Sequence, residues 1–505
     1  MNRKALHGSI RRHITEKKLK TTQWGRNLIR FAGRLRARID NNQPLEISRV
    51  VFKKKNRSDE LRMLSVTENL EDRVLQKLTA SYLRERVDPV LDRCVCAFRS
   101  RGTGLHSEPV ADLINFARKH DGAQLYAAEA DIVAFFDTIP HSVVMDSVEI
   151  AIEKLRVREE NIDHRALAII KIALDTYSFE DALEKGTSEL QASSRGLLIA
   201  TPPEELLCEL RERYGARGFG LPQGGSISPI LANLVLTRVD SMVMKVPGSE
   251  MGYYRRYCDD ILIVHPDENV CQRMLDEYMR GLSCLGLAAH EPSKEPVSPR
   301  EFFEQKTLLP YRWGSKSIHP ENRGWVSFLG YHIRYDGNLR LRKNTVRNEH
   351  DKQIQLVDKI LTTIDKNLES ALRMPSDVHP HFRGTLRMIS MAVGRNRLRA
   401  QGRAIPQPCW SDAFPLLKPN RSISQQLRRL DRNRERQLQR LKRALERRGI
   451  PVTWPKFWRP RSFTHFGAPY SYFSLLRGAD RPGIPDFPKR RSRSIRPAFL
   501  RKYGS

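Results

Sequence analysis

The 505-residue chain is poor in cysteine, and its seven cysteines form no Cys-x-x-Cys pair and no regular spacing. The sequence therefore suggests neither a zinc ribbon nor a disulfide framework, and it fits a reducing compartment. Long apolar runs are also lacking, since no window approaches the 18 residues of a membrane-spanning helix. The basic first residues contain no apolar stretch of the signal-peptide kind. We therefore expect a cytoplasmic protein with no membrane partner.

Negative charge is scarce as well. Asp and Glu number 58 against 88 Lys and Arg, which gives a formal net charge of +30 and indicates a polyanionic partner. Residues 1–58 carry 17 basic and 3 acidic side chains, and residues 341–505 carry 37 and 12, whereas residues 59–340 carry 34 and 43. Both ends are thus basic around a slightly acidic middle. The length exceeds one ordinary hydrophobic core, so several domains or a multi-lobed enzyme are expected.

The apolar pattern divides the chain into a mixed body and a helical part. Residues 59–340 alternate short apolar runs with helical periods, and Asp336-Gly337 predicts a turn between two short strands. Two amphipathic helices are expected after this turn. Their buried faces are predicted to hold Ile354, Val357, Leu361, Ile364 and Leu368 in the first helix, and Ile423, Leu427, Leu430, Leu438, Leu441 and Leu445 in the second.

Two acidic positions lie in apolar, strand-like surroundings. Asp259-Asp260 precedes Ile261 to Val264, and Asp131 follows the run from Leu125 to Ala130. Acids in such places are costly unless a cation or a tight turn requires them. Two-metal phosphoryl transfer uses carboxylates that converge from separate strands, and these acids could supply them. A satisfied turn or helix cap is the alternative interpretation of each.

A glycine-rich segment extends from Gly220 to Pro229 and leads into an apolar helix. Glycine lets the backbone approach a ligand closely, and a helix N-terminus favours phosphate groups. The segment is therefore a candidate contact for a nucleotide or a template strand, although ordinary turns have a similar composition.

In chain order these motifs resemble a known family. Asp131 to Asp137, Gly220 to Pro229 and Tyr257 to Asp260 resemble the palm motifs of reverse transcriptases of the bacterial group II intron and retron kind. Upstream segments resemble the fingers motifs of that family: Leu61 to Val66, Glu71 to Gln76 and Ala97 to Gly102. Downstream segments resemble its later palm motifs: Gly286-Leu287 with Lys294, and Phe328 to Tyr331. The resemblance spans about residues 45–345 in unbroken order.

The resemblance implies an α+β right-hand polymerase. Its expected parts are a basic helical extension over 1–44, fingers over 45–125, a palm with an antiparallel sheet over 126–340, a helical thumb over 341–405 and a basic, Arg- and aromatic-rich RNA-binding extension over 406–505. A helical insertion is expected within the palm at about 150–215.

The resemblance also implies roles for individual residues. Asp131, Asp259 and Asp260 would be the catalytic acids and would hold two Mg²⁺ ions, with Mn²⁺ as a substitute and the carbonyl of Ile132 as a further metal contact. Phe136 would exclude a ribose 2′-OH. The expected nucleotide contacts are Gln223, Tyr257, Arg62, Lys55 and Lys294, the last assisting pyrophosphate departure. A solvated surface charge is the alternative for the basic residues.

Motifs that the sequence lacks indicate which subclass of reverse transcriptases it resembles most. Residues 341–505 contain a single cysteine, unlike an intron nuclease domain, and the retron strings Asn-Ala-x-x-His and Val-Thr-Gly do not occur. The chain most resembles stand-alone reverse transcriptases of bacterial anti-phage defence, which implies an RNA-directed DNA polymerase that uses deoxynucleotides to copy a partner non-coding RNA into DNA. We expect RNA contacts from Arg428, Arg432, Arg436, Arg440, Arg447, Trp454 and Trp458. An intron maturase and a non-catalytic RNA-binding descendant remain alternatives, and a homo-oligomer remains open.

Overall fold

The structure is a computed structural model that divides into two compact units. Unit 1 comprises residues 1–348, 399–403 and 412–418, and unit 2 comprises 349–398, 404–411 and 419–505. The residues that the structure describes are 23–41, 43–46, 49–54, 61–67, 69–99, 107–120, 123–177, 208, 212, 218–292, 299–302, 305–314, 323–372, 379–393, 396–398, 404–406, 410–452 and 471–476. Each unit is described by itself.

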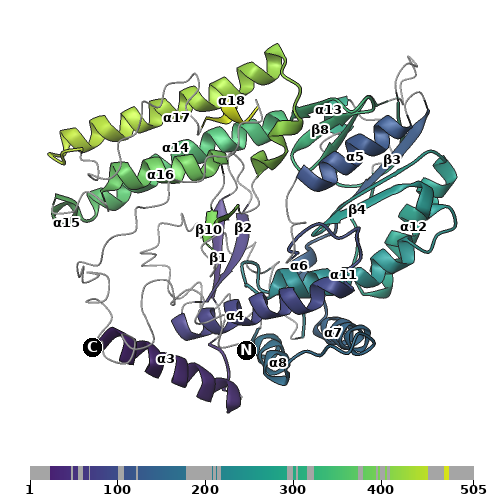
Figure 1. Ribbon diagram of the computed structural model, residues 1–505, viewed down its shortest axis with the longest axis horizontal. Helices are drawn as coiled ribbons and strands as arrows, with labels where there is room; N and C mark the ends of the chain where they lie inside the picture. Colours follow the sequence, from purple (N-terminus) through teal and green to yellow (C-terminus); the bar gives the residue numbers. More distant parts are fainter. Residues whose placement is uncertain are drawn as a thin grey trace. The chain divides into compact units, whose positions relative to one another are not determined.

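Unit 1 mixes helices with antiparallel strands (Figure 1). Its helices are α3 (Gln23–Asp40), α4 (Leu70–Val87), η1 (Asp88–Val90), α5 (Ser107–Lys119), α6 (Phe135–Thr138), α7 (His141–Arg156), α8 (His164–Thr176), α11 (Ser228–Val243), η2 (Ser249–Met251), α12 (Glu268–Cys284) and α13 (Pro299–Phe302). Its strands are β1 (Arg49–Lys54), β2 (Leu61–Val66), β3 (Leu125–Ala130), β4 (Tyr253–Tyr257), β5 (Asp260–His265), β6 (Leu308–Trp313), β7 (Trp325–Phe328), β8 (Tyr331–Arg334) and β9 (Leu339–Leu341).

The central sheet has the order β4-β5-β3-β6, and all of its neighbours are antiparallel. Successive residues of a strand face opposite sides, and both sides of this sheet are buried. Ile261 and Ile263 pack in one core cluster with α11 and α12, while Leu262 and Val264 face the other side. On that second side, the hydroxyl of Tyr253 donates to the carbonyl oxygen of Pro109 in α5. Burial on both faces explains why β5 is a continuous apolar run rather than an alternating one.

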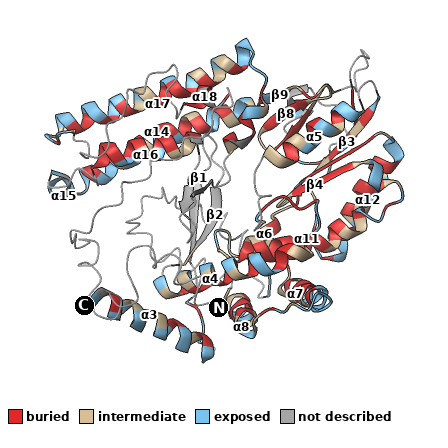
Figure 2. Cartoon of the chain, in the orientation of Figure 1, coloured by how far each residue is buried: buried red, intermediate tan, exposed pale blue. Residues whose placement is uncertain are grey.

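Helix α11 is the most completely buried helix segment beside this sheet, and Figure 2 shows it mostly in the buried colour. It is apolar on nearly all sides because α7 and α12 pack against it. Pro229 stands in its first turn, where the missing N–H costs nothing. The helix therefore begins within the last two residues of the glycine-rich segment, and Oγ of Ser228 donates back to the carbonyl oxygen of Pro222 at 2.9 Å.

Strands β7, β8 and β9 form a separate three-stranded antiparallel sheet. Gly337 has φ +76°, as expected for the turn predicted between β8 and β9. A mixed fold of helices with antiparallel sheets is therefore confirmed. The assignment of fingers, palm and thumb stays a prediction. Of the helical insertion expected at about 150–215, the structure describes residues 150–177, which include the end of α7 and all of α8, and residues 208 and 212.

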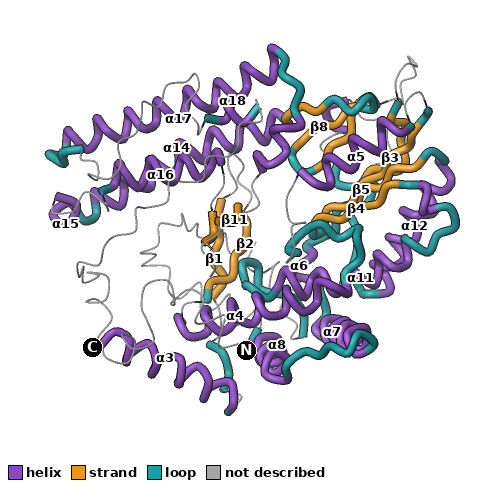
Figure 3. The backbone as a smooth tube through the Cα atoms, viewed as in Figure 1, coloured by secondary structure: helices purple, strands orange, loops and turns teal. Residues whose placement is uncertain are grey.

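Unit 2 is mainly helical, as the tube in Figure 3 shows. Its elements are α14 (Lys343–Asp365), which begins in unit 1, α15 (Leu368–Leu372), α16 (Pro380–Val393), β10 (Asn396–Leu398), β11 (Ala404–Pro406), η3 (Trp410–Leu416), which ends in unit 1, α17 (Arg421–Arg447) and α18 (Tyr472–Leu475). The apolar face predicted for α17 is buried throughout. It packs on Val357, Ile364 and Met388 of α14 and α16. The predicted stripe of the preceding helix ends early, because Leu368 belongs to α15 and is 40% exposed.

No helix among the described residues is both long enough and apolar enough to cross a lipid bilayer.

Candidate active site

The acidic pair lies at the tip of the hairpin formed by β4 and β5. Tyr257 pairs with Asp260, so Cys258 and Asp259 make a two-residue turn. Cys258 has φ +63°, a left-handed conformation that is uncommon outside glycine, asparagine and aspartate. Two-residue hairpin turns favour this conformation because its twist matches that of the strands. The turn therefore sets both acids at one end of the sheet.

The sheet register brings Asp131 to the same end. Ala130, the last residue of β3, pairs with Ile261 of β5, so the next pair in the antiparallel ladder is Asp131 with Asp260. Both side chains then lie on the face that also carries Glu129. Two stretches that are more than 100 residues apart thus contribute carboxylates to one site.

The carboxylates perturb one another electrostatically. Asp260 keeps a solvent-exposed surface, yet surrounding protein atoms desolvate its carboxylate. This desolvation, followed by the charges of Asp259 and Asp131, raises the pKa of Asp260 to about 6. The pKa of Asp259 is also raised, mainly by burial and further by the charge of Asp131. A site that concentrates negative charge in this way favours a bound cation.

Lys306 supplies a positive charge to the site that the sequence motifs did not indicate. Its Nζ donates to Oδ2 of Asp131. Partial burial opposes the charged form of this lysine, but the hydrogen bond and the negative charge of Asp131 raise its pKa. The register explains the contact, since Leu308 of β6 pairs with Glu129 of β3, and Lys306 and Asp131 each lie two residues beyond that pair. Sequence spacing alone carried no signal for a pair separated by 175 residues.

Arg256 supports the acidic turn from inside the protein. Its side chain and that of Asp240 in α11 are both fully buried, and their ion pair measures 2.6 Å. Arg256 also donates through Nη1 to the carbonyl oxygen of Cys258 at 3.0 Å and to Oδ1 of Asn233 at 2.9 Å. The hydroxyl of Tyr254 donates to Asp240 at 2.7 Å. Every charge in this network is paired, so the network can position the turn without a large electrostatic cost.

The glycine-rich segment is joined to α6, which follows Asp131. The amide of Leu221 donates to the carbonyl oxygen of Phe136 at 2.6 Å, and Nε2 of Gln223 donates to the carboxylate of Asp137 at 3.0 and 3.2 Å. Burial raises the pKa of Asp137 to about 6, although the bond from Gln223 opposes this shift. Gly220 has φ +88°, and a side chain there would crowd the ring of Tyr177 and the carbonyl oxygen of Asp137. Phe136 and Gln223 are consequently held on neighbouring segments.

Ile132 lies beside these acids with a buried side chain. It forms a bridge with Ala289, in which His290 donates to the carbonyl oxygen of Asp131 and Val133 donates to that of Ala288. The carbonyl oxygen of Ile132 itself receives no hydrogen bond from any described residue. It is thus available as an oxygen ligand.

The donor set of the site suits a divalent cation. Carboxylate and carbonyl oxygens are the ligands that hard cations such as Mg²⁺ and Mn²⁺ prefer. The residues therefore fit a divalent cation by charge and by donor chemistry. Within the described ranges, however, no three His, Cys, Asp or Glu side chains are close enough to one another to form a coordination shell, and the ammonium group of Lys306 pairs with Asp131.

Several predicted contacts cannot be placed at the site. Arg62 lies in β2 opposite Lys53, but nothing is described of its side chain. Tyr257 is half-buried at the end of β4. The residues outside the described part of the chain are Lys55, Lys294, Trp454 and Trp458. Their roles stay predictions.

The arginines predicted to bind RNA lie on α17 in unit 2, and the structure separates them into two groups. Arg432, Arg436 and Arg447 are exposed. Arg428, by contrast, stacks over the ring of Phe473 at 4.5 Å, and Arg440 pairs with Asp358 of α14. Arg428 thus has an internal contact, whereas Arg440 is exposed as well as paired, and RNA binding by all five arginines stays a prediction.

Comparison with known proteins adds a family to this geometry. Residues 196–303 match the family described as reverse transcriptase (RNA-dependent DNA polymerase). This segment is a reverse transcriptase domain. It contains the glycine-rich segment together with Asp259 and Asp260, and the enzyme class that it indicates is RNA-directed DNA polymerase. Reverse transcriptase domains use divalent metal ions, in agreement with the oxygen donors described above.

Solved structures similar to the chain include telomerases of two yeasts. The chain is 13% identical to telomerase from Candida albicans in complex with a TWJ fragment of telomeric RNA, with 90% of this chain and 71% of that chain covered and a TM-score of 0.35. It is 13% identical to an apo telomerase from Candida tropicalis truncated from its C-terminal domain, with 59% and 55% covered and a TM-score of 0.34. The chain therefore spans about half to about 70% of these telomerase chains. No curated protein matches the sequence.

Proposed function

We propose that the reverse transcriptase domain performs its chemistry at Asp131, Asp259 and Asp260, with Mg²⁺ as the cation. The observation that carries this proposal is the register of β3 and β5, which sets Asp131 beside the Cys258-Asp259 turn. Acids from two strands that share one end of a sheet are the arrangement that phosphoryl transfer with two cations requires. When bound, the cations would lower the pKa of the primer 3′-OH and neutralise the phosphates of the nucleotide.

In the proposed reaction, the 3′-oxygen of the primer attacks the α-phosphate of a deoxynucleoside triphosphate. A phosphodiester bond forms, the bond between the α- and β-phosphates breaks, and pyrophosphate leaves. Phe136 would restrict the space beside the sugar of the nucleotide. Gln223 would contact the nucleotide, and the carboxylate of Asp137 would hold the side-chain amide of Gln223 in place. Arg256 would keep the acidic turn in place through the carbonyl oxygen of Cys258.

The template that the enzyme copies and its biological role form a second part of the proposed function. We infer that the enzyme copies a partner non-coding RNA during anti-phage defence. The support is the resemblance of residues 45–345 to that class and the excess of basic residues after residue 340. Expression of the chain with its neighbouring genomic RNA should protect a host in a phage plaque assay, and the Asp259→Asn/Asp260→Asn variant should not protect it.

The decisive experiment for the chemistry is incorporation of labelled deoxynucleotides on a primed RNA template. Asp259→Asn/Asp260→Asn should lower the rate by at least about 10³-fold, because several kcal/mol of charge stabilisation is lost. Asp276→Asn/Glu277→Gln is the matched control, since it also changes two adjacent acids, the exposed Asp276 and the half-buried Glu277 that pairs with Arg280, on α12. Removal of divalent cations with EDTA should stop the wild-type reaction.

Equal rates in the wild type and the Asp259→Asn/Asp260→Asn variant would refute the assignment of the site. A wild type that incorporates no nucleotide but retains a discrete RNA would favour the non-catalytic RNA-binding alternative.

A further inference from the structure

Helix α17 carries a row of exposed arginines on one side, and the positions of these arginines say more about a binding partner than the net charge of the chain does. Its sequence has ten basic and three acidic side chains. The exposed members without an ion-pair partner in the described part of the chain are Arg421, Arg429, Arg432, Arg436, Arg443 and Arg447. Arg421 is the first residue of the helix, and we call the other five residues the arginine row. They comprise three residues of the predicted set and two that the prediction did not name.

The arginine row is straight. With 3.6 residues per turn, its five positions fall within a sector of about 60° around the helix axis. The row extends over 18 residues, or about 27 Å at 1.5 Å per residue. The buried residues Ile423, Leu438 and Leu441 lie on the opposite side of the helix. The apolar face is thus occupied by the core of unit 2, and only the charged face is available to a partner.

The acidic side chains near α17 are engaged elsewhere. Asp431 accepts from the buried Arg434, Asp358 pairs with Arg440, and Asp365 pairs with Arg448 at 2.6 Å. None of them neutralises the arginine row. Carboxylates that could have quenched the row pair instead with cations outside it, so the row keeps its full charge for an external anion.

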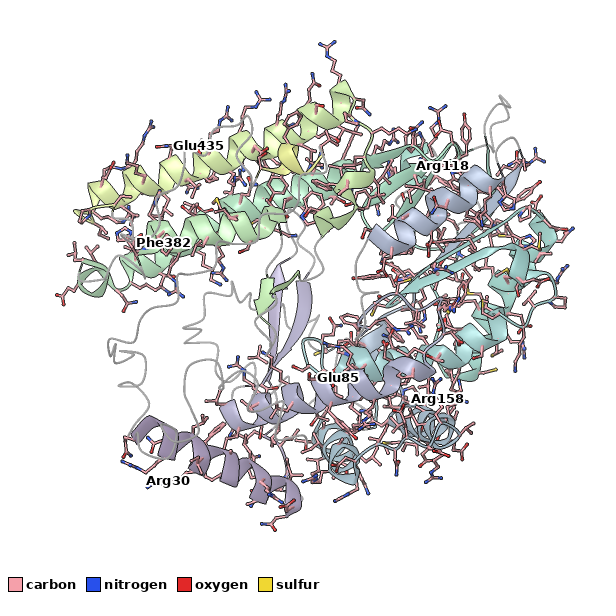
Figure 4. The ribbon with its side chains drawn as sticks, viewed as in Figure 1. Arg30, Glu85, Arg118, Arg158, Phe382 and Glu435 are labelled. Carbon is pink, nitrogen blue, oxygen red and sulfur yellow. The ribbon has the colours of Figure 1, made fainter. Side chains whose placement is uncertain are left out.

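On α17, Glu446 pairs with Lys442 at 3.9 Å, and the other carboxylate that borders the arginine row is Glu435. It accepts a hydrogen bond from Gln439 at 3.0 Å, and both residues line the same shallow hollow as Arg432 and Arg436. Figure 4 shows Glu435 on α17 and Phe382 on α16; Phe382 is 1% exposed and belongs to the interior of unit 2. Two acids beside five arginines leave this surface positive.

We propose that the arginine row binds the sugar-phosphate backbone of a double-helical segment of the partner RNA. The inference rests on the proposed function for the existence of that RNA, and it adds which surface holds the RNA and what that surface recognises. A rigid row of planar guanidinium groups suits phosphates at fixed positions. A double helix presents such phosphates without first being ordered, whereas a flexible strand loses conformational entropy on binding. Backbone recognition of this kind is independent of base sequence.

The salt dependence of RNA binding tests the proposal. The probe is a fluorescein-labelled RNA hairpin of 20 base pairs and arbitrary sequence, titrated with the full chain at several salt concentrations. Arg432→Gln/Arg436→Gln/Arg443→Gln/Arg447→Gln should weaken binding at least about 30-fold at 0.15 M salt and should reduce the slope of log K against log salt by about 3. Glutamine keeps the helix propensity close to that of arginine, and circular dichroism verifies the fold.

A matched variant removes the same charge from unit 1. Lys119→Gln/Lys154→Gln/Arg156→Gln/Lys171→Gln changes four exposed cations on α5, α7 and α8, and it should weaken binding less than about threefold. Glu435→Gln should strengthen binding a few-fold, because it removes the negative charge beside the row. The unit 1 variant separates local recognition from a general loss of net charge, because it removes the same number of positive charges away from the arginine row.

Three results would overturn the proposal. The first is a four-arginine variant that loses no more affinity than the unit 1 variant, and the second is a slope that stays unchanged. The third is a DNA hairpin of the same sequence that binds more tightly than the RNA hairpin, which would reassign the row to DNA. Failure of the proposed function is distinguishable, because Asp259→Asn/Asp260→Asn should abolish nucleotide incorporation and leave the slope for the hairpin at the wild-type value.

Discussion

Arg256 and Arg436 place the same guanidinium group in opposite surroundings. In unit 1, Arg256 is fully buried and its donors are used by Asp240, Asn233 and Cys258. In unit 2, Arg436 is exposed on α17 with no ion-pair partner among the described residues. A buried charge must be paired, so it becomes part of the framework, whereas an exposed and unpaired charge contributes little to folding and remains available to a ligand.

The largest effect on stability is expected from breaking the buried pair. Arg256→Met should lower the free energy of unfolding by about 3–5 kcal/mol, because Asp240 would remain buried without its countercharge and would keep only the hydrogen bond from Tyr254. Arg436→Met, the exposed counterpart, should change it by less than about 0.5 kcal/mol. Urea denaturation of both variants measures the difference. Similar values for the two would contradict the division into framework and ligand-binding arginines.

A smaller effect should appear in the pH dependence of unit 1. The pKa of Asp137 is raised to about 6 by burial, so between pH 4 and pH 6 the folded state binds more protons than the unfolded state. The contribution of this group to stability therefore falls as the pH rises through that window. Relative to the wild type, Asp137→Asn should gain stability from pH 4 to pH 7, by at most about 3 kcal/mol.

The measurement is the free energy of unfolding of both proteins at each pH. The asparagine amide of the Asp137→Asn variant would still accept a hydrogen bond from Gln223, so the two proteins differ mainly in the titrating group. A difference that does not change with pH would mean that Asp137 titrates near its ordinary value.

Substitution of Lys306 should change the free energy of unfolding by about 1 kcal/mol, because its side chain is 60% exposed and solvent screens its pairing with Asp131. Lys306→Gln should lower the melting temperature measured in EDTA, since the three carboxylates lose their neighbouring cation. Addition of Mg²⁺ should raise the melting temperature of this variant more than that of the wild type. An equal rise in both proteins would indicate that the lysine and the metal ion do not occupy the same electrostatic position.

The smallest effect belongs to the exposed ion pair of unit 2. Asp358 and Arg440 are each nearly half exposed, so Asp358→Asn should cost no more than about 1 kcal/mol. The same variant frees Arg440 beside the arginine row, and it should strengthen binding of the RNA hairpin slightly. Urea denaturation of this variant measures what Arg440 contributes to stability, and titration with the RNA hairpin measures what it contributes to RNA binding. A large loss of stability would place this pair with the framework charges of unit 1.

Local features of the fold could be predicted from the sequence. The apolar run of β5, the turn at Gly337 and the buried face of α17 follow from periodicity and turn chemistry, and the order of the motifs indicated the reverse transcriptase class that the family match supports. Each of these depends on residues close together in the chain.

The contacts between distant parts of the chain could not be predicted, because they depend on strand register and on which side chains meet in the tertiary structure. Lys306 reaches Asp131 only because β6 pairs with β3 across a shift between Ala127 and Glu129, and no local pattern encodes such a shift. Arg256 and Asp240 did leave a signal, since each is a charge within an apolar segment, but the signal does not name the partner. On α17, periodicity identified the exposed side, whereas the pairing of Arg440 with α14 required the tertiary structure.

The two-residue turn at Cys258 and Asp259 also limits how this protein could change in evolution. Asp260 already pairs with Tyr257, so the hairpin has no spare length at its tip. One inserted residue would reverse the side of the sheet to which every following residue of β5 points, and it would carry Asp260 away from Asp131. Surface loops elsewhere could lengthen at a small entropic cost. The length of this hairpin is therefore fixed, whereas residues of the hairpin other than the two acids can be substituted without a change of register.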